Sequence, residues 1–316
     1  MQTMIEVNKS QIFPYGRLLA SALVCAVALM VSGCGGGATS SSDNTRMVTV
    51  SVPPLEYFVT AIAGDSVVVN TLMDSGSDPE TFQPGMGLMR DVNRSDILMV
   101  TGVIPFEKGL VAGIERNVPG LKIGDVGEGV EYMYGTHSHS HGDALHAGDA
   151  HDHNHAGEPD PHIWSSVKNA RIISDNVLAR LSEAYPELAG YFSGRHGVLK
   201  ARFDSLDAEY EKRLSAHPSF AIWHPSLSYF ARDYGLEQIA FNLENKETSP
   251  LRLRQATDHA LEHAPAAFFV PAGLPANRVA AISDILGLEP VEVNFMDADW
   301  EGQMELIVDT LVSEKQ

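Results

Sequence analysis

Histidine and aspartate are concentrated in one stretch of the sequence, residues 135–158. Seven of the thirteen histidines lie there, namely His137, His139, His141, His146, His151, His153 and His155. Imidazole and carboxylate groups bind divalent transition metals without help from a thiol. The apolar residues of the stretch have neither helical nor strand spacing, so it cannot bury a core. We therefore expect a loop that contacts metal, with a merely solvated low-complexity run as the alternative.

Three further residues have the types and positions of metal ligands. His162 closes the histidine-rich region, His224 follows an apolar strand predicted at 219–223, and Glu80 lies in a loop after a strand predicted at 65–72. In open α/β sheets, ligands bind at the carboxyl ends of strands, so the three loops could converge on one cleft. Spacing alone leaves ordinary alternatives open, because a lone histidine is often a hydrogen-bonded structural residue and a loop glutamate is usually solvated.

The elements that would position these residues alternate between strand and helix. Apolar periodicity and turn residues predict strands at 47–52, 65–72, 97–101, 219–223, 238–243, 266–270 and 290–294. They predict helices at 55–63, 87–93, 165–180, 187–215, 226–234, 251–263, 275–286 and 300–312. Strands separated by helices indicate mostly parallel sheets. The expected fold class is α/β: two α/β lobes with mostly parallel sheets, linked by one long helix, with a metal cleft between the lobes.

The helix predicted at 187–215 has one apolar face. That face is formed by Leu199, Phe203, Leu206, Tyr210 and Leu214, with charges between them, which predicts a half-exposed helix. The histidines outside any motif are expected at the surface or in helix caps: His196, His217, His259 and His263.

Charge and cysteine content exclude several kinds of site. The formal net charge of −19 argues against a nucleic-acid partner, because an acidic surface repels phosphate. The two cysteines, Cys25 and Cys34, both lie near the N-terminus, so a cysteine-ligated zinc site is excluded for the rest of the chain. Any metal must therefore be held by histidine, carboxylate, amide or backbone groups.

The N-terminus reads as an export signal. Polar residues with Lys9 and Arg17 precede an apolar segment, 18–33, which is too short for a comfortable membrane-spanning helix. The end of that segment, from Val31 to Cys34, resembles a bacterial lipobox, in which the cysteine is acylated. The Gly- and Ser-rich run that follows suits a flexible tether. We expect a lipid anchor at Cys34, with an ordinary signal peptide as the alternative.

The predicted organisation follows from these segments. It comprises a lipoprotein signal peptide at 1–33, a tether at 34–46, an N-terminal lobe at 47–186 with the histidine-rich loop at 135–158, a connecting helix at 187–217 and a C-terminal lobe at 218–316.

Several segments together resemble a known family. They are Val50–Leu55, Asp78–Pro84, Asp160–Trp164, Trp223–His224 with Tyr229–Leu236, and Glu244–Pro250. On these segments the chain resembles the zinc/manganese-type solute-binding lipoproteins of ABC importers, the ZnuA-like or cluster A-I group. The most specific match is Asp160–Trp164, and the histidine-rich loop before it is typical of the zinc-binding members. The family fold, two α/β lobes bridged by one long helix, agrees with the reading from periodicity.

The resemblance implies a ligand set and a role. The metal ligands would be Glu80, His162 and His224, with Asn294 at the fourth position and Asp297 or Asp299 as alternatives. Glu80 replaces the family's usual histidine, and Asn294 replaces its usual acidic residue. The transported ligand would be Zn²⁺, with Mn²⁺ possible. The implied partners are an ABC permease and its ATPase. The protein would be a non-enzymatic monomer, anchored on the periplasmic or extracellular side of the membrane.

Two other classes of protein are alternatives to a solute-binding protein. A metallohydrolase would need an open metal position and a general base, but the sequence has no HExxH motif and no second set of carboxylates. A surface zinc-buffering or adhesion protein would use the same histidine-rich loop without a permease.

Overall fold

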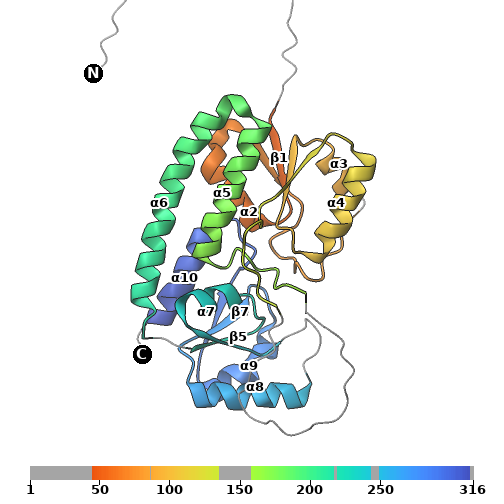
Figure 1. Cartoon of the computed structure of the whole chain (residues 1–316). Coiled ribbons are helices and arrows are strands. Elements are labelled where there is room, and N and C mark those ends of the chain that lie inside the picture. The colour runs from red at the N-terminus through yellow and green to blue at the C-terminus, as the bar shows by residue number, and fades with distance from the viewer. Residues whose placement is uncertain (1–44, 86, 135–157, 217–218, 243–248, 314–316) are drawn as a thin grey trace, which may run out of the picture. The chain divides into compact units, whose positions relative to one another are not determined.

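Two four-stranded parallel sheets form the framework of the protein in the computed structural model (Figure 1). The structure describes residues 45–85, 87–134, 158–216, 219–242 and 249–313. The signal segment with Cys34 and the seven histidines from His137 to His155 lie outside the described residues. No helix within the described ranges is both long enough and apolar enough to cross a bilayer.

The first sheet has the strand order β2-β1-β3-β4. Its strands are β1 (Met47–Val50), β2 (Val68–Thr71), β3 (Ile97–Val100) and β4 (Lys122–Asp125). The helical segments that follow them are α2 (Pro53–Ala63), η1 (Gly64–Ser66), α3 (Leu88–Val92) and α4 (Pro105–Asn117). All four residues of β3 are buried, as its unbroken apolar sequence predicts. The helix predicted from residue 55 begins at Pro53, because proline is tolerated in the first turn, where its missing N–H has no helical partner.

The second sheet repeats the pattern, with the order β6-β5-β7-β8. Its strands are β5 (Ser219–Ile222), β6 (Glu237–Ala240), β7 (Phe268–Pro271) and β8 (Pro290–Val293). Its helices are α7 (Ser228–Tyr234), α8 (Pro250–His263), α9 (Ala276–Leu286) and α10 (Trp300–Val312). The helix α7 ends at Gly235, which adopts the left-handed conformation (φ 65°) that glycine reaches without steric cost.

Two long helices lie between the sheets in the sequence, α5 (Val167–Ala184) and α6 (Ala189–Arg213), with the short η2 (Pro186–Leu188) between them. The helix α6 packs against α5, α2 and α10. Its predicted apolar face, from Leu199 to Tyr210, is buried, as is Leu214 just beyond it. The predicted fold class, α/β with two mostly parallel sheets linked by a long helix, is confirmed. The lobe boundaries stay a prediction.

His196 corrects one expectation. The sequence predicts a surface or helix-cap residue, but His196 lies inside α6 and is only 7% exposed. Its Nε2 lies 3.3 Å from Ser174 Oγ on α5 and 3.1 Å from Asp175 Oδ1. The reason is helical periodicity. His196 lies four residues after the buried Phe192 and three before the buried Leu199, so it belongs to the face that packs against α5.

Candidate metal site

Glu80 is presented by a loop that follows β2. The loop is shaped by Asp78, whose carboxylate accepts hydrogen bonds from the Glu80 backbone N–H (2.9 Å) and from the Thr81 hydroxyl (3.0 Å). Such local bonds from an aspartate fix a turn without regular secondary structure. The side chain of Glu80 is 32% exposed, so its carboxylate lies at the boundary between solvent and the interior.

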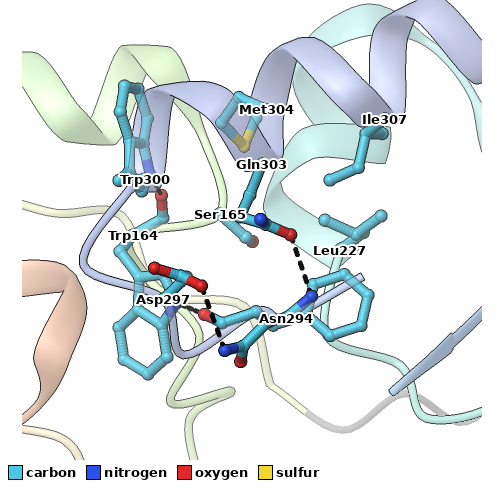
Figure 2. Close-up of a pocket in the computed structure, with 10 residues that line it drawn as sticks. Trp164, Ser165, Leu227, Asn294, Asp297, Trp300, Gln303, Met304 and Ile307 are labelled. Atoms are coloured by element: carbon cyan, nitrogen blue, oxygen red, sulfur yellow. Dashed lines mark hydrogen bonds between the residues drawn. The ribbon is translucent and has the colours of Figure 1, made fainter. Parts of the chain in front are cut away.

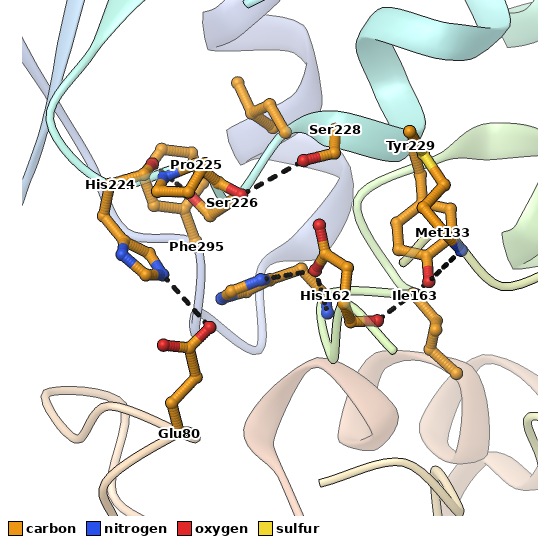
Figure 3. Close-up of polar contacts among 12 residues, drawn as sticks. Glu80, Met133, His162, Ile163, His224, Pro225, Ser226, Ser228, Tyr229 and Phe295 are labelled. Carbon is orange, nitrogen blue, oxygen red and sulfur yellow. Dashed lines mark hydrogen bonds and ion pairs between the residues drawn. The ribbon is translucent and has the colours of Figure 1, made fainter. Parts of the chain in front are cut away.

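His162 is buried in the segment between β4 and α5, and its orientation is fixed by Asp160. Its Nδ1 lies 2.8 Å from Asp160 Oδ1, and its backbone N–H donates to the same oxygen (2.9 Å). The Asp160 segment is held in turn by Tyr229 of α7, whose hydroxyl donates to the Asp160 carbonyl at 2.8 Å (Figure 3). A carboxylate on one imidazole nitrogen orients the other toward a metal. In His162 the nitrogen available to a metal is therefore Nε2, because Nδ1 faces Asp160.

His224 follows β5 of the second sheet, and its imidazole has no hydrogen-bond partner among the described residues. Both Nδ1 and Nε2 are buried and unsatisfied. The nearest carboxylate oxygen, Glu80 Oε1, is 3.7 Å from Nε2, which is longer than a hydrogen bond (Figure 3). A buried polar group without a partner costs about 1–3 kcal/mol. The sequence therefore keeps an imidazole here at a cost to the stability of the protein.

The three residues from separate loops form one group. One ligand atom from each of Glu80, His162 and His224 lies within 4.8 Å of the other two, and the two imidazole rings meet edge to face with centroids 5.2 Å apart. Zinc–nitrogen and zinc–oxygen bonds measure about 2.0–2.2 Å, so small shifts of these side chains would bring all three atoms within reach of one ion. We call this group, Glu80, His162 and His224, the buried trio.

The two histidines of the buried trio have opposite electrostatic environments. Burial alone would lower the pKa of His162, but the hydrogen bond and charge of Asp160 outweigh burial and raise it. Burial, with a smaller contribution from the positive charge of His162, lowers the pKa of His224 to about 4. At neutral pH His224 is therefore an uncharged imidazole, the form that binds metal.

The three candidates for the fourth ligand lie in the loop between β8 and α10 and are joined by hydrogen bonds. Figure 2 shows two of them, Asn294 and Asp297. The Asn294 amide donates to Asp297 Oδ2 (3.2 Å), and its carbonyl oxygen accepts from the Met296 N–H (3.1 Å). Asp297 also accepts from the Asp299 N–H, and Asp299 caps α10. Among the described residues, neither Asp297 nor Asp299 joins the buried trio. The fourth ligand stays a prediction, with Asn294 in that position and Asp297 or Asp299 as alternatives.

The same loop is attached to the His162 segment by two tryptophans. The Trp164 indole N–H donates to the Phe295 carbonyl (2.8 Å), and the Trp300 indole N–H donates to the Trp164 carbonyl (2.6 Å). These bonds join the segment that carries His162 to the loop that carries Asn294. Sequence reasoning missed this connection, because it depends on contacts 131 and 136 residues apart in the chain.

Sequence reasoning also missed a second group of candidate ligands. His259 and His263, expected as isolated surface or cap residues, both meet Glu237. The signal available in the sequence was the four-residue spacing of the two histidines on a predicted helix, which places them on one face. Nothing in the spacing pointed to Glu237.

Two metal-binding proteins of other bacteria are similar in sequence to much of this chain. The zinc-binding protein AdcA of Streptococcus pyogenes is 30% identical over 232 residues, which is 69% of this chain and 43% of AdcA. The chain therefore spans less than half the length of that relative. A putative metal-binding protein of Treponema pallidum is 24% identical over 271 residues, 83% of each chain.

Solved structures share the fold. A crystal structure of ZnuA superposes with a TM-score of 0.74 at 24% identity, covering 85% of this chain and 98% of that one. The family model described as "Zinc-uptake complex component A periplasmic" matches residues 48–314, which include all three residues of the buried trio. With a match of that extent, the chain belongs to the family of the periplasmic component A of zinc-uptake complexes.

Proposed function

We propose that this protein captures Zn²⁺ outside the cytoplasmic membrane and delivers it to the permease and ATPase of an ABC importer. The observation that carries the proposal is His224, whose two ring nitrogens are buried and unpartnered beside Glu80 and His162. A bound cation would satisfy one of these nitrogens and would offset the charge of the carboxylate. Membership in the zinc-uptake family supports this physiological role.

Zinc is preferred over manganese because of the ligand types. Two imidazoles and a carboxylate suit a tetrahedral zinc shell completed by one more ligand, which is Asn294, Asp297 or Asp299, or else water. Manganese favours more oxygen ligands than the buried trio provides. Glu80, which stands where the family usually has histidine, shifts the set toward manganese, so Mn²⁺ is the alternative cargo. The chemistry required is binding and release, in which no covalent bond changes.

The remaining parts of the proposal concern location and delivery. A lipid anchor at Cys34 would hold the protein at the membrane, and the histidine-rich loop would collect zinc as an accessory to the buried trio. A monomer is sufficient, because all three proposed ligands come from one chain. The acidic net charge of −19 suits attraction of a cation.

Titration calorimetry with Zn²⁺ tests the proposed site. The His162→Ala, His224→Ala double variant should lose the tightest equivalent and keep the weaker binding of the histidine-rich loop. A matched control, in which residues 137–155 are deleted, should lose the weaker equivalents that the histidine-rich loop contributes and keep the tight one. Retention of a tight equivalent by the double variant would show that the site lies elsewhere. Repeating the titration with Mn²⁺ decides between the two metals.

A further inference from the structure

A second cluster of two histidines and a glutamate lies on the second sheet, on residues that the proposed function does not use. His259 and His263 are four residues apart on α8, and Glu237 is the first residue of β6. The helix α8 packs against β6, which brings the three side chains together. We call Glu237, His259 and His263 the surface trio.

Both imidazoles converge on one carboxylate. His259 Nε2 lies 2.7 Å from Glu237 Oε1, and His263 Nδ1 lies 2.6 Å from Glu237 Oε2. The two rings lie against each other with centroids 4.2 Å apart. One ligand atom from each residue lies within 4.8 Å of the others. We propose that the surface trio is a second binding site for a zinc-class divalent cation.

Tautomerism lets the surface trio replace its hydrogen bonds by a cation without losing its arrangement or releasing a proton. Whenever its ring is neutral, each imidazole can donate its one N–H to Glu237. A neutral imidazole can carry that proton on its other nitrogen instead, which frees His259 Nε2 and His263 Nδ1 as ligands. The carboxylate then binds the same cation. Two imidazoles, a carboxylate and a water molecule complete a tetrahedral zinc shell.

The surroundings of the surface trio favour a cation and leave it accessible. The three side chains are 37%, 41% and 39% exposed for His259, His263 and Glu237, so an ion and a water ligand can enter from solvent. His263 is the last residue of α8, where the helix dipole places partial negative charge. The His263 carbonyl accepts a hydrogen bond from the Ser219 hydroxyl of β5 at 2.9 Å, which fixes the end of the helix against the sheet.

The expected affinity is lower than that of the buried trio. The surface trio is solvated, so water competes for each ligand and for the cation. Its nitrogens already have partners, so binding removes no unsatisfied group. The proposal does not rest on the function assigned to the buried trio, because the two share no residue.

Histidine-selective ¹⁵N NMR of the full chain, titrated with Zn²⁺, locates the site. The Nε2 signal of His259 and the Nδ1 signal of His263, assigned with single variants, should shift as those atoms become ligands. Signals that stay unchanged at zinc concentrations that saturate the histidine-rich loop would overturn the proposal.

Equilibrium dialysis with Zn²⁺ alone supplies a matched comparison. Glu237→Gln keeps the size of the side chain but weakens a metal ligand, and should lower the affinity of one equivalent by at least about tenfold, the lower end of what outer-shell changes alone produce. Glu262→Gln removes the same charge from an exposed position on α8 and should leave that equivalent unchanged. Identical binding by the two variants would also overturn the proposal.

Discussion

Among the described residues, two histidines and a glutamate meet twice, and the two groups differ in what surrounds them. In the buried trio, His162 is oriented by Asp160, and His224 has both ring nitrogens buried without a partner. In the surface trio, His259 and His263 donate to Glu237 itself and are substantially exposed. The buried trio is therefore incomplete without a cation, whereas the surface trio is satisfied with or without one. Ligand types alone do not separate a tight site from a weak one.

The first prediction concerns the orienting carboxylate Asp160, which has no counterpart in the surface trio. Asp160→Asn should lower the zinc affinity of the buried trio by about 10–100-fold, the range found when outer-shell partners of metal-ligating histidines are changed. The physical reason is that an amide beside Nδ1 neither fixes one tautomer nor raises the basicity of Nε2. Competition with a chelator of known zinc affinity measures the change.

Glu107→Gln is the control for Asp160→Asn. Glu107 is also a buried carboxylate, and it accepts hydrogen bonds from the Thr101 and Gly102 backbone N–H groups. Its replacement should reduce stability and leave zinc affinity unchanged. Equal losses of zinc affinity in the two variants would mean that Asp160 acts only through the general stability of the fold.

The sequence predicted the framework well and the second site poorly, for a physical reason. Strand β3 is four buried apolar residues, and α7 ends at a glycine, so local pattern was sufficient for both. The prediction for His196 was wrong because the apolar face predicted for α6 began at Leu199, whereas the buried face extends back to Phe192. Glu237 meets His259 because β6 and α8 pack together, and a contact between elements is not written in the spacing of either one.

The buried trio shows the same division between local and long-range information. The Asp160–Trp164 segment is local, and its resemblance to a known ligand loop picked out His162. The fourth ligand depends on how the loop between β8 and α10 folds, and there Asn294 bonds to Asp297. The residue types in that loop do not predict which hydrogen bonds form within it. The sequence therefore could not identify the fourth metal ligand.

The second prediction uses the unsatisfied imidazole of the buried trio. His224→Leu should abolish tight zinc binding yet raise the free energy of unfolding of the metal-free protein by about 1–3 kcal/mol, because it removes two buried nitrogens without partners. Chemical denaturation in the presence of a chelator measures the change. A variant less stable than the wild type at every pH would show that His224 has a structural role.

The pH dependence of that gain has a definite sign. The pKa of His224 is lowered to about 4, chiefly by burial, whereas in the unfolded chain it titrates near 6.5. Between these values the unfolded state binds more protons, so the contribution of His224 to stability falls as the pH drops from about 6.5 to about 4. Leucine does not titrate, so the advantage of His224→Leu should grow over this window. His162 is present in both proteins, so its direct contribution cancels in the difference.

The smallest expected effect belongs to the surface trio. Glu237→Gln should lower the free energy of unfolding of the metal-free protein by no more than about 1 kcal/mol, because exposed ion pairs contribute little. Added zinc should increase the difference in stability between Glu237→Gln and the control Glu262→Gln. An ion that binds only the folded state stabilises it in proportion to the logarithm of its concentration over Kd. Thermal unfolding of Glu237→Gln and Glu262→Gln, with and without Zn²⁺, measures both quantities. If the difference in stability between the two variants stays constant as the zinc concentration rises, Glu237 serves only to hold the two histidines. The surface trio would then be a set of ordinary contacts between surface side chains.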